Sequence, residues 1–243
     1  MAMVLEPNQL VIDGVDISSM VILESTERVL VPEIESQTLS VPSRDGVIFK
    51  GLNKGSKQIK LSLRVVPEKL GDIDELQSVY DALLPLLFKK KIMKLETYDL
   101  PGRYELVVND SLISGKRFLG TGEIELLYLN LSGISYSNMI NTTLTNNGNI
   151  PTPFILSGKY TSGTPITVLN NSTLEKIQII NTGIVKDDVI KIDFENEIVY
   201  KNEKNIMKNV YVESDFWDLD VGVNSIKVTG LSSTTYEHRD RWL

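Results

Sequence analysis

Segments in which apolar and polar residues alternate recur along almost the whole chain. Residues 59–65, 103–108 and 189–194 have the period of a strand with one buried face. From residue 153 onward, short segments of this kind follow one another at about ten-residue spacing, with turn residues between them. This pattern predicts a mainly β fold, with a β-sandwich in the second half of the chain.

A single helix is predicted near residues 73–84. Its apolar side chains recur at spacings of three and four and are Ile73, Leu76, Tyr80, Leu83 and Leu84. Asp72 is placed to cap the first turn, and Pro85 is placed to end or kink the helix.

A β-hairpin is predicted directly after this helix. Residues 91–98 and 103–108 read as its strands, and Pro101-Gly102 suits the centre of a type II turn. Proline presets its own φ there, and glycine accepts the positive φ that follows.

The chain has 243 residues, and domains hold roughly 150 residues each, so one or two domains are expected. Residues 132–149 are polar, uncharged and rich in turn formers, which is typical of a junction. We therefore predict an N-terminal β-domain at 1–135, containing the helix, and a C-terminal β-sandwich at 136–243.

Composition argues against most catalytic and nucleic-acid-binding functions. The chain has no cysteine and one histidine, His238, so thiol chemistry is absent and a catalytic triad would depend on that ring. Acidic residues outnumber basic ones by 32 to 25, which disfavours binding to phosphate backbones. No apolar stretch approaches the roughly 20 residues of a membrane span. We expect no enzymatic activity, no cofactor, no sequence-specific nucleic-acid binding, no membrane insertion, and a surface or interface position for His238.

Carboxylates offer two candidate sites. The first is a row of carboxylates that alternates with apolar residues: Asp193, Glu195 and Glu197. The alternation predicts that they form the solvated face of one strand. A cation site and a glycosidase-like pair are the alternatives. Trp217 lies among acids, so a glycan contact through Trp217, Asp215 and Asp218 is one interpretation. The other places the aromatic residue in the core, with the aspartates capping turns.

One predicted strand is apolar on both faces. Because a strand buries only alternate residues against its own domain, the second face of 122–131 could be covered by another subunit. The candidate interface residues are Ile124, Leu126, Leu127, Leu129 and Leu131.

Several short motifs, in order, resemble the distal tail protein (Dit) family of long-tailed, non-contractile phages. They lie at Gly71–Leu76, Leu100–Tyr104, Pro153–Gly158, Ser214–Ile226 and Tyr236–Leu243. The chain departs from the family at Val221, where many members carry proline before the Gly and Asn that match Gly222 and Asn224.

The resemblance implies an N-terminal domain that forms a homo-hexameric ring and a C-terminal sandwich of galectin-like topology. It also implies a virion protein at the tail tip, made in the bacterial host cytoplasm. The ring would join the tail tube protein to the tail-associated tip or lysin protein and to receptor-binding proteins, with a central channel for DNA. The alternatives are a free-standing carbohydrate-binding module for cell-wall glycans and, third, a carboxylate-pair glycosidase.

Overall fold

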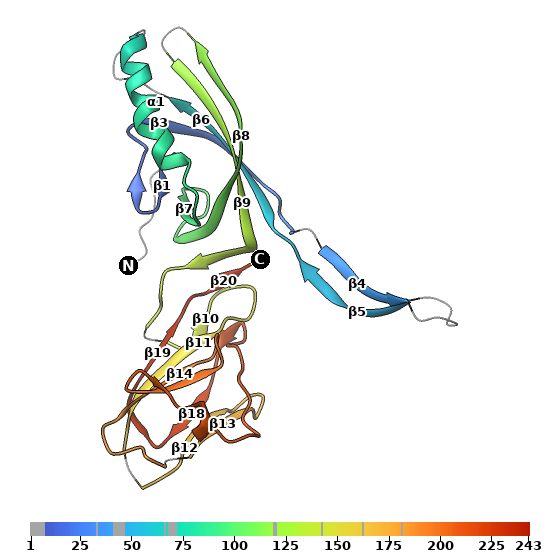
Figure 1. Cartoon of the computed structure of the whole chain (residues 1–243), viewed down its shortest axis with the longest axis vertical. Coiled ribbons are helices and arrows are strands. Elements are labelled where there is room, and N and C mark those ends of the chain that lie inside the picture. The colour runs from blue at the N-terminus through green and yellow to red at the C-terminus, as the bar shows by residue number, and fades with distance from the viewer. Residues whose placement is uncertain are drawn as a thin grey trace. The chain divides into compact units, whose positions relative to one another are not determined.

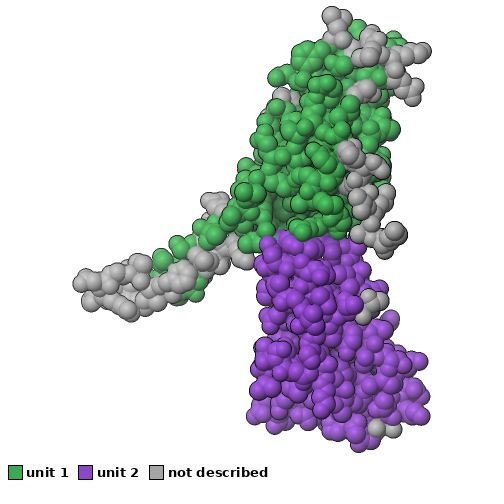
Figure 2. Space-filling model, turned by 180° about the vertical axis from the view of Figure 1, so that it is seen from behind, with its two compact units in different colours: residues 1–135, 243 green, residues 136–242 purple. Residues whose placement is uncertain are grey.

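The computed structural model describes residues 8–32, 34–40, 47–65, 67, 72–118, 121–141, 143–161, 163–180 and 182–243. The chain divides into two compact units (Figure 2), Met1–Ser135 with Leu243, and Tyr136–Trp242. Strands dominate both units, so the predicted mainly β fold is confirmed (Figure 1). Within the described part of the chain, no helix is long and apolar enough to cross a membrane.

Unit 1 is built on one curved sheet. Its strands lie side by side in the order β2 (Val15–Asp16), β1 (Leu10–Ile12), β7 (Met93–Thr97), β8 (Arg103–Phe118), β9 (Thr121–Ser137), β6 (Lys57–Val65) and β3 (Val21–Arg28). The last two residues of β9 belong to unit 2. Two further strands, β4 (Ile34–Ser40) and β5 (Val47–Lys54), form a separate two-stranded sheet.

Helix α1 (Ile73–Leu87) covers one face of this sheet, and its predicted cap is confirmed. The Asp72 carboxylate accepts hydrogen bonds from the N–H groups of Asp74 and Glu75, at 3.1 and 3.2 Å. Pro85 lies in the last turn, and the helix continues to Leu87, three residues past its predicted end. Ile73 and Leu84 are exposed, although the helical spacing placed them on the apolar face.

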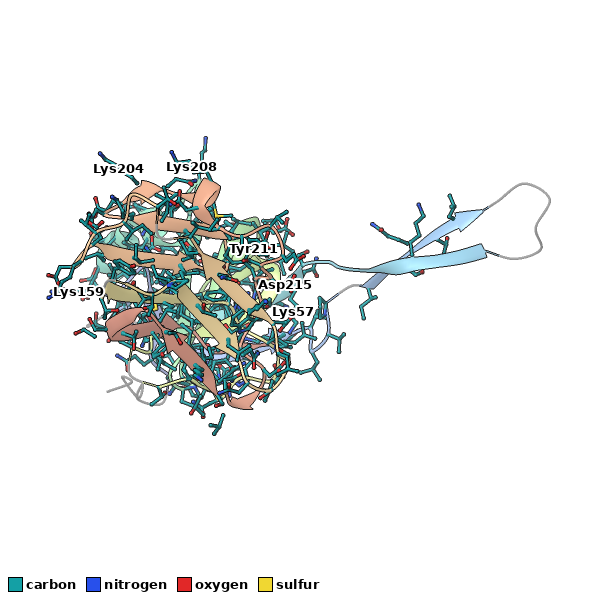
Figure 3. All side chains as sticks on the ribbon, turned by 90° about the horizontal axis from the view of Figure 1, so that it is seen from below. Lys57, Lys159, Lys204, Lys208, Tyr211 and Asp215 are labelled. Carbon is teal, nitrogen blue, oxygen red and sulfur yellow. The ribbon has the colours of Figure 1, made fainter. Side chains whose placement is uncertain are left out.

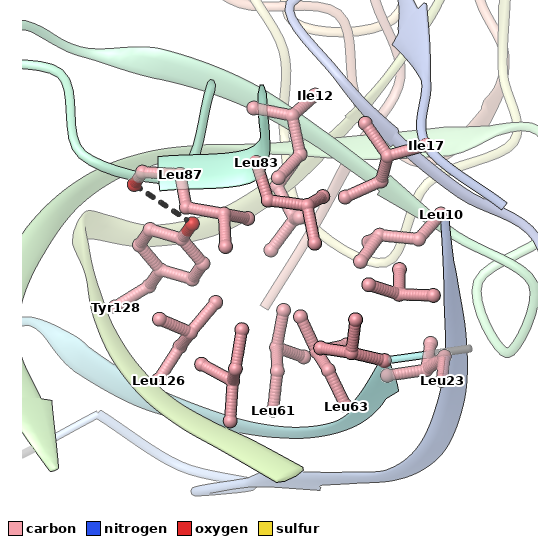
Figure 4. Close-up of a cluster of buried hydrophobic side chains, with 14 of the residues drawn as sticks. Leu10, Ile12, Ile17, Leu23, Leu61, Leu63, Leu83, Leu87, Leu126 and Tyr128 are labelled. Atoms are coloured by element: carbon pink, nitrogen blue, oxygen red, sulfur yellow. Dashed lines mark hydrogen bonds between the residues drawn. The ribbon is translucent and has the colours of Figure 1, made fainter. Parts of the chain in front are cut away.

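The core of unit 1 lies between α1 and the sheet (Figure 4). Leu83 and Leu87 of the helix pack with side chains of β1, β3, β6 and β9. Burying each large apolar side chain stabilises the unit by about 1.5–3 kcal/mol. The Tyr128 hydroxyl donates to the carbonyl oxygen of Leu87 at 3.1 Å, which satisfies a carbonyl that the helix end leaves free.

The predicted hairpin is formed by β7 and β8. The Arg103 N–H donates to the Leu100 carbonyl at 3.1 Å, and Gly102 has a φ of +72°. The Pro101-Gly102 turn is therefore confirmed, with glycine at the position that requires a positive φ.

Unit 2 is a β-sandwich, as predicted. One sheet has the order β16 (Lys204–Asn205), β15 (Ile198–Lys201), β14 (Val189–Asp193), β11 (Phe154–Tyr160), β19 (Leu231–His238), and the other β13 (Lys176–Ile179), β12 (Ile166–Asn170), β18 (Ile226–Thr229). β10 (Thr145–Asn146) pairs with β17 (Gly222–Val223), and the unit also holds η1 (Met207–Asn209) and β20 (Arg241–Trp242).

His238 is in the interior of unit 2, so its predicted surface or interface position is wrong. Its side chain is fully covered, and Nε2 lies 3.1 Å from the Thr145 carbonyl oxygen. As the last residue of β19 it pairs with Phe154, the first residue of β11. This pairing between distant segments determines its burial.

Candidate assembly surfaces

The ribbon of β4 and β5, which we call the arm, extends away from the sheet and helix of unit 1 (Figure 1). The chain enters it through Val29, Leu30 and Val31, which are 48, 85 and 56 % exposed, and Ile34 on β4 is also exposed. An isolated two-stranded ribbon is only marginally stable in water. An exposed apolar stretch next to unpaired strand edges is typical of a surface that another chain covers.

Arg28, the last residue of β3, fixes the root of the arm. Its Nε lies 3.0 Å from a carboxylate oxygen of Glu105 on β8, and Nη2 donates to the Thr97 hydroxyl on β7 at 2.6 Å. It also pairs with Asp99 in the β7–β8 turn. Since β3 and β7 are far apart in the strand order, this one side chain joins distant parts of the curved sheet.

A second set of contacts supports the same root. Asn130 of β9 is buried, donates to the Ile134 carbonyl at 3.0 Å and accepts from the Gly133 N–H at 3.1 Å. Gly133 has a φ of +64° and lies so close to Pro32 that an added Cβ would be 3.2 Å from the proline ring. Partial burial lowers the pKa of Lys57, against the opposing effect of Glu105.

The predicted interface residues on β9 divide between its two faces. Ile124 and Leu126 are buried against α1 in the core of unit 1, so their assignment to a subunit interface is wrong. Leu127 and Leu129 alternate with them, are partly covered, and pair with Lys60 and Gln58 of β6; Leu131 is exposed. The strand period therefore leaves only Leu127, Leu129 and Leu131 as interface candidates.

In unit 2, Trp217 is part of the hydrophobic core. It is 7 % exposed, and its ring packs edge-on against Phe194 at 4.9 Å between centroids, with Phe154 at 6.3 Å. Because so little of the ring is exposed, the predicted glycan contact through Trp217 is corrected to a core position. Asp215 and Asp218 are exposed on either side of it.

An acidic recess of about 490 Å³ lies against these rings. Phe194 and Trp217 line it, together with Glu175, Glu197, Asp218 and Asp220. Asp218 is exposed, but neighbouring protein atoms remove part of the hydration of its carboxylate, and this desolvation raises its pKa. Arg241 acts in the opposite direction, and Glu195 and Asp220 raise the pKa further. The ionised carboxylate therefore destabilises the folded unit relative to the unfolded chain.

Replacing Asp218 with asparagine should therefore stabilise unit 2 at pH 7. The pKa of Asp218 is higher in the folded unit than in the unfolded chain. The gain in the free energy of unfolding is therefore complete above the folded pKa, and it disappears as the pH falls to about 4. Both tryptophans belong to unit 2, so tryptophan fluorescence during urea unfolding measures this stability. Asp215→Asn is the matched control and should have no effect; equal stabilisation by both variants at pH 7 would contradict the argument.

The expected row of carboxylates on one strand face is wrong. β14 ends at Asp193, whose side chain is buried and accepts hydrogen bonds from the N–H groups of Glu195 and Asn196 at 3.1 and 3.0 Å. Glu195 and Glu197 are exposed in the turn that follows. Among the described residues, no three His, Cys, Asp or Glu side chains come together as a possible metal site.

Two family models match consecutive segments of the chain. The phage tail protein RIFT-related domain matches residues 15–128, and the C-terminal domain of the siphovirus-type tail component matches residues 147–242. The chain belongs to the siphovirus distal tail protein (Dit) family. The resemblance predicted from the sequence motifs is thus confirmed, and the family is one of structural phage tail proteins.

The fold of this family member is also that of solved phage structures. The crystal structure of the Dit protein of phage SPP1, described as a paradigm of hub adsorption apparatus in phages infecting Gram-positive bacteria, matches with a TM-score of 0.75 and 16 % identity. The match covers 97 % of this chain and 99 % of that one. A chain of the phage P2 baseplate in its activated conformation with Ca matches with a TM-score of 0.50 and 12 % identity, over 96 and 97 % of the two chains. No curated protein sequence matches.

The departure from the family pattern at Val221 does not remove the turn. Gly222 has a φ of +98°, and the Asn224 side chain accepts from the Asp220 N–H at 2.9 Å and donates to the Asp220 carbonyl at 2.8 Å. The glycine and asparagine shape the turn without the proline. None of the short motifs on which the resemblance rests lies in the arm, and the one sequence signal for it is the apolar run Val29–Val31 that leads into it.

Proposed function

We propose that the chain is the hub of a siphovirus tail tip, a structural protein that acts as a closed ring of identical subunits. The proposal rests on the arm and on the run Val29–Val31 that leads into it, because their exposed apolar residues need a partner surface that the described residues of unit 1 do not supply. An arm that binds a different surface on the next copy makes a head-to-tail contact, and such contacts close into rings. The similarity to a protein described as part of a hub adsorption apparatus supports the same role.

The proposed number of subunits and the proposed partners of the ring follow from the family resemblance. The ring has six subunits, docks the tail tube protein on one side and the tip or lysin protein on the other, and holds receptor-binding proteins at its periphery. DNA leaves through its centre, and the net charge of −7 suits a channel that DNA crosses without binding. The protein has no catalytic role in this proposal, and its place is the virion tail tip.

The proposed subunit contact at the root of the arm can be tested by Leu30→Asp, a change within the apolar run that leads into the arm. A charge placed in an apolar contact loses hydration without gaining a partner, so we expect each subunit contact to weaken by about 2 kcal/mol and rings to dissociate. Sedimentation velocity and native mass spectrometry should give about six chains per particle for the unchanged protein and mainly monomers for the variant.

Val212→Asp is the matched control, because Val212 is an equally exposed apolar residue of unit 2. It should leave the particle mass unchanged. A monomeric unchanged protein at high concentration would contradict the ring. A ring that survives Leu30→Asp would show that the arm does not hold it together.

A further inference from the structure

A second recess, of about 520 Å³, lies on the outer face of the sheet β16–β15–β14–β11–β19 of unit 2. We call it the sheet recess; it is lined by Ser157, Val189, Lys191, Tyr200, Asn202 and Glu203. Ser157, Lys191 and Tyr200 are direct cross-strand partners on β11, β14 and β15, so they form one row across the sheet. Their neighbours Ile190, Ile192 and Val199 point into the core, which directs the row outward.

Four polar groups that line the sheet recess have unused hydrogen-bonding capacity. Within the described part of the chain, the Ser157 hydroxyl, the Lys191 ammonium, the Tyr200 hydroxyl and the Glu203 carboxylate have no hydrogen-bond or ion-pair partner. Together they offer donors and acceptors within one hollow, and Val189 and the ring of Tyr200 add apolar surface. A few convergent polar groups beside apolar and aromatic surface are typical of small-ligand sites, whose volumes are about 300–1,000 Å³.

Glu203 is held in the recess by a strained turn. Asn202 and Glu203 form the two-residue loop between β15 and β16, with φ values of +45° and +66°. Such loops favour glycine at the second position, because a Cβ in this conformation costs about 1–2 kcal/mol. Non-glycine residues in strained conformations cluster at binding sites.

Asn202 fixes this turn against β14. Its Oδ1 accepts from the Val189 N–H at 2.9 Å, and its Nδ2 donates to Asp188 at 2.7 Å. Lys204, the next residue after Glu203, is exposed and extends into solvent (Figure 3). The turn that carries Glu203 is therefore already fixed in the absence of a ligand. Less conformational entropy is lost when the Glu203 carboxylate binds one.

We propose that the sheet recess binds a neutral saccharide, namely a hexose or N-acetylhexosamine unit of a larger glycan. Sugar rings combine apolar C–H faces with hydroxyls that both donate and accept, which matches the mixture of Tyr200, Ser157, Lys191 and Glu203. One cation and one anion in the recess leave no net charge to attract a polyanion or a polycation. This site lies apart from the Trp217 cluster, and the proposal does not depend on ring assembly.

The full chain can be titrated with maltose, lactose and N,N′-diacetylchitobiose by saturation-transfer difference NMR. We expect at least one of these sugars to bind with a Kd of about 1 mM. Tyr200→Ala and Glu203→Gly should each weaken that binding by at least about tenfold, the loss that 1.4 kcal/mol represents. Tyr211→Ala is the matched control, because Tyr211 is an exposed tyrosine of the same unit outside the recess (Figure 3).

Glu203→Gly separates a binding role from a structural one. Glycine removes the strain at φ +66°, so the melting temperature of this variant should rise while saccharide binding falls. Binding to none of the three sugars at about 20 mM, well above a millimolar Kd, would overturn the proposal. So would binding that survives both recess variants, binding that is lost in Asp218→Asn instead, or a preference for poly(glycerol phosphate) over the neutral sugars.

Discussion

Replacing Arg28 with methionine is expected to destabilise unit 1 by about 3 kcal/mol. The side chain of Glu105 is only 5 % exposed, and Arg28 is its ion-pair partner. Methionine keeps the apolar stem of arginine but removes the guanidinium, so the buried Glu105 carboxylate loses its ion-pair partner. Removing one partner of a buried pair costs far more than the pair contributes, because the remaining charge has lost its hydration.

Hydrogen exchange measured by mass spectrometry can localise this effect. Peptides from β6 and β9 report on unit 1, and a loss of 3 kcal/mol corresponds to about 100-fold faster exchange at amides that open only on unfolding of the unit. Because Arg28 directly precedes the apolar run that leads into the arm, the same variant should also weaken subunit association. The stability of the Arg28 contacts at the root of the arm would then affect assembly of the proposed ring.

Two comparisons isolate the buried charge as the cause. Arg28→Met combined with Glu105→Gln should recover most of the lost stability, because the neutral amide can be buried at lower cost. Lys60→Met removes a pair with Glu125 in which both side chains are about one-third exposed, and should cost less than about 1 kcal/mol. Equal losses for Arg28→Met and Lys60→Met would contradict the argument.

Features fixed by neighbouring residues were predictable from the sequence. Asp72 caps α1 through bonds that reach two and three residues along the chain, and Gly102 adopts the positive φ that its turn requires. The helical period likewise identifies the segment that forms the helix, and alternation identifies segments that form strands, because both patterns are local.

Features that depend on distant segments were not predictable. The strand alternation of β9 separates Ile124 from Leu127 but does not say which of the two faces meets α1. The structure places Ile124 in the core and Leu127 on the opposite face. His238 lies in a charged segment, and its burial follows from pairing with Phe154, far earlier in the chain. The sequence does not reveal the arm for the same reason, because its strands look like any others until the sheet order shows that they form a separate two-stranded sheet.

Replacing Gly122 with alanine is expected to destabilise unit 1 by about 3 kcal/mol, the upper part of the range for overpacked cores. Gly122 lies near the start of β9, beneath Tyr80 of α1. An added Cβ would lie 2.1 Å from the Tyr80 hydroxyl oxygen and 2.9 Å from its Cζ, so the tyrosine must leave its position. Tyr80 is buried in the core and contacts Arg117 of β8, so its displacement disturbs the helix and the β8–β9 hairpin together.

Tyr80→Phe allows a double-mutant cycle on this contact. Among the described residues, none forms a hydrogen bond with the buried Tyr80 hydroxyl, so its removal alone should be neutral or stabilising. In the Tyr80→Phe background the closest clashing atom is gone, and Gly122→Ala should cost about 1 kcal/mol less than in the unchanged chain. Gly115→Ala on β8 is the matched control, since its nearest neighbour would be 3.9 Å away, and it should change stability little. If Gly122→Ala cost the same with and without the hydroxyl, the contact with Tyr80 would not be what requires glycine at this position.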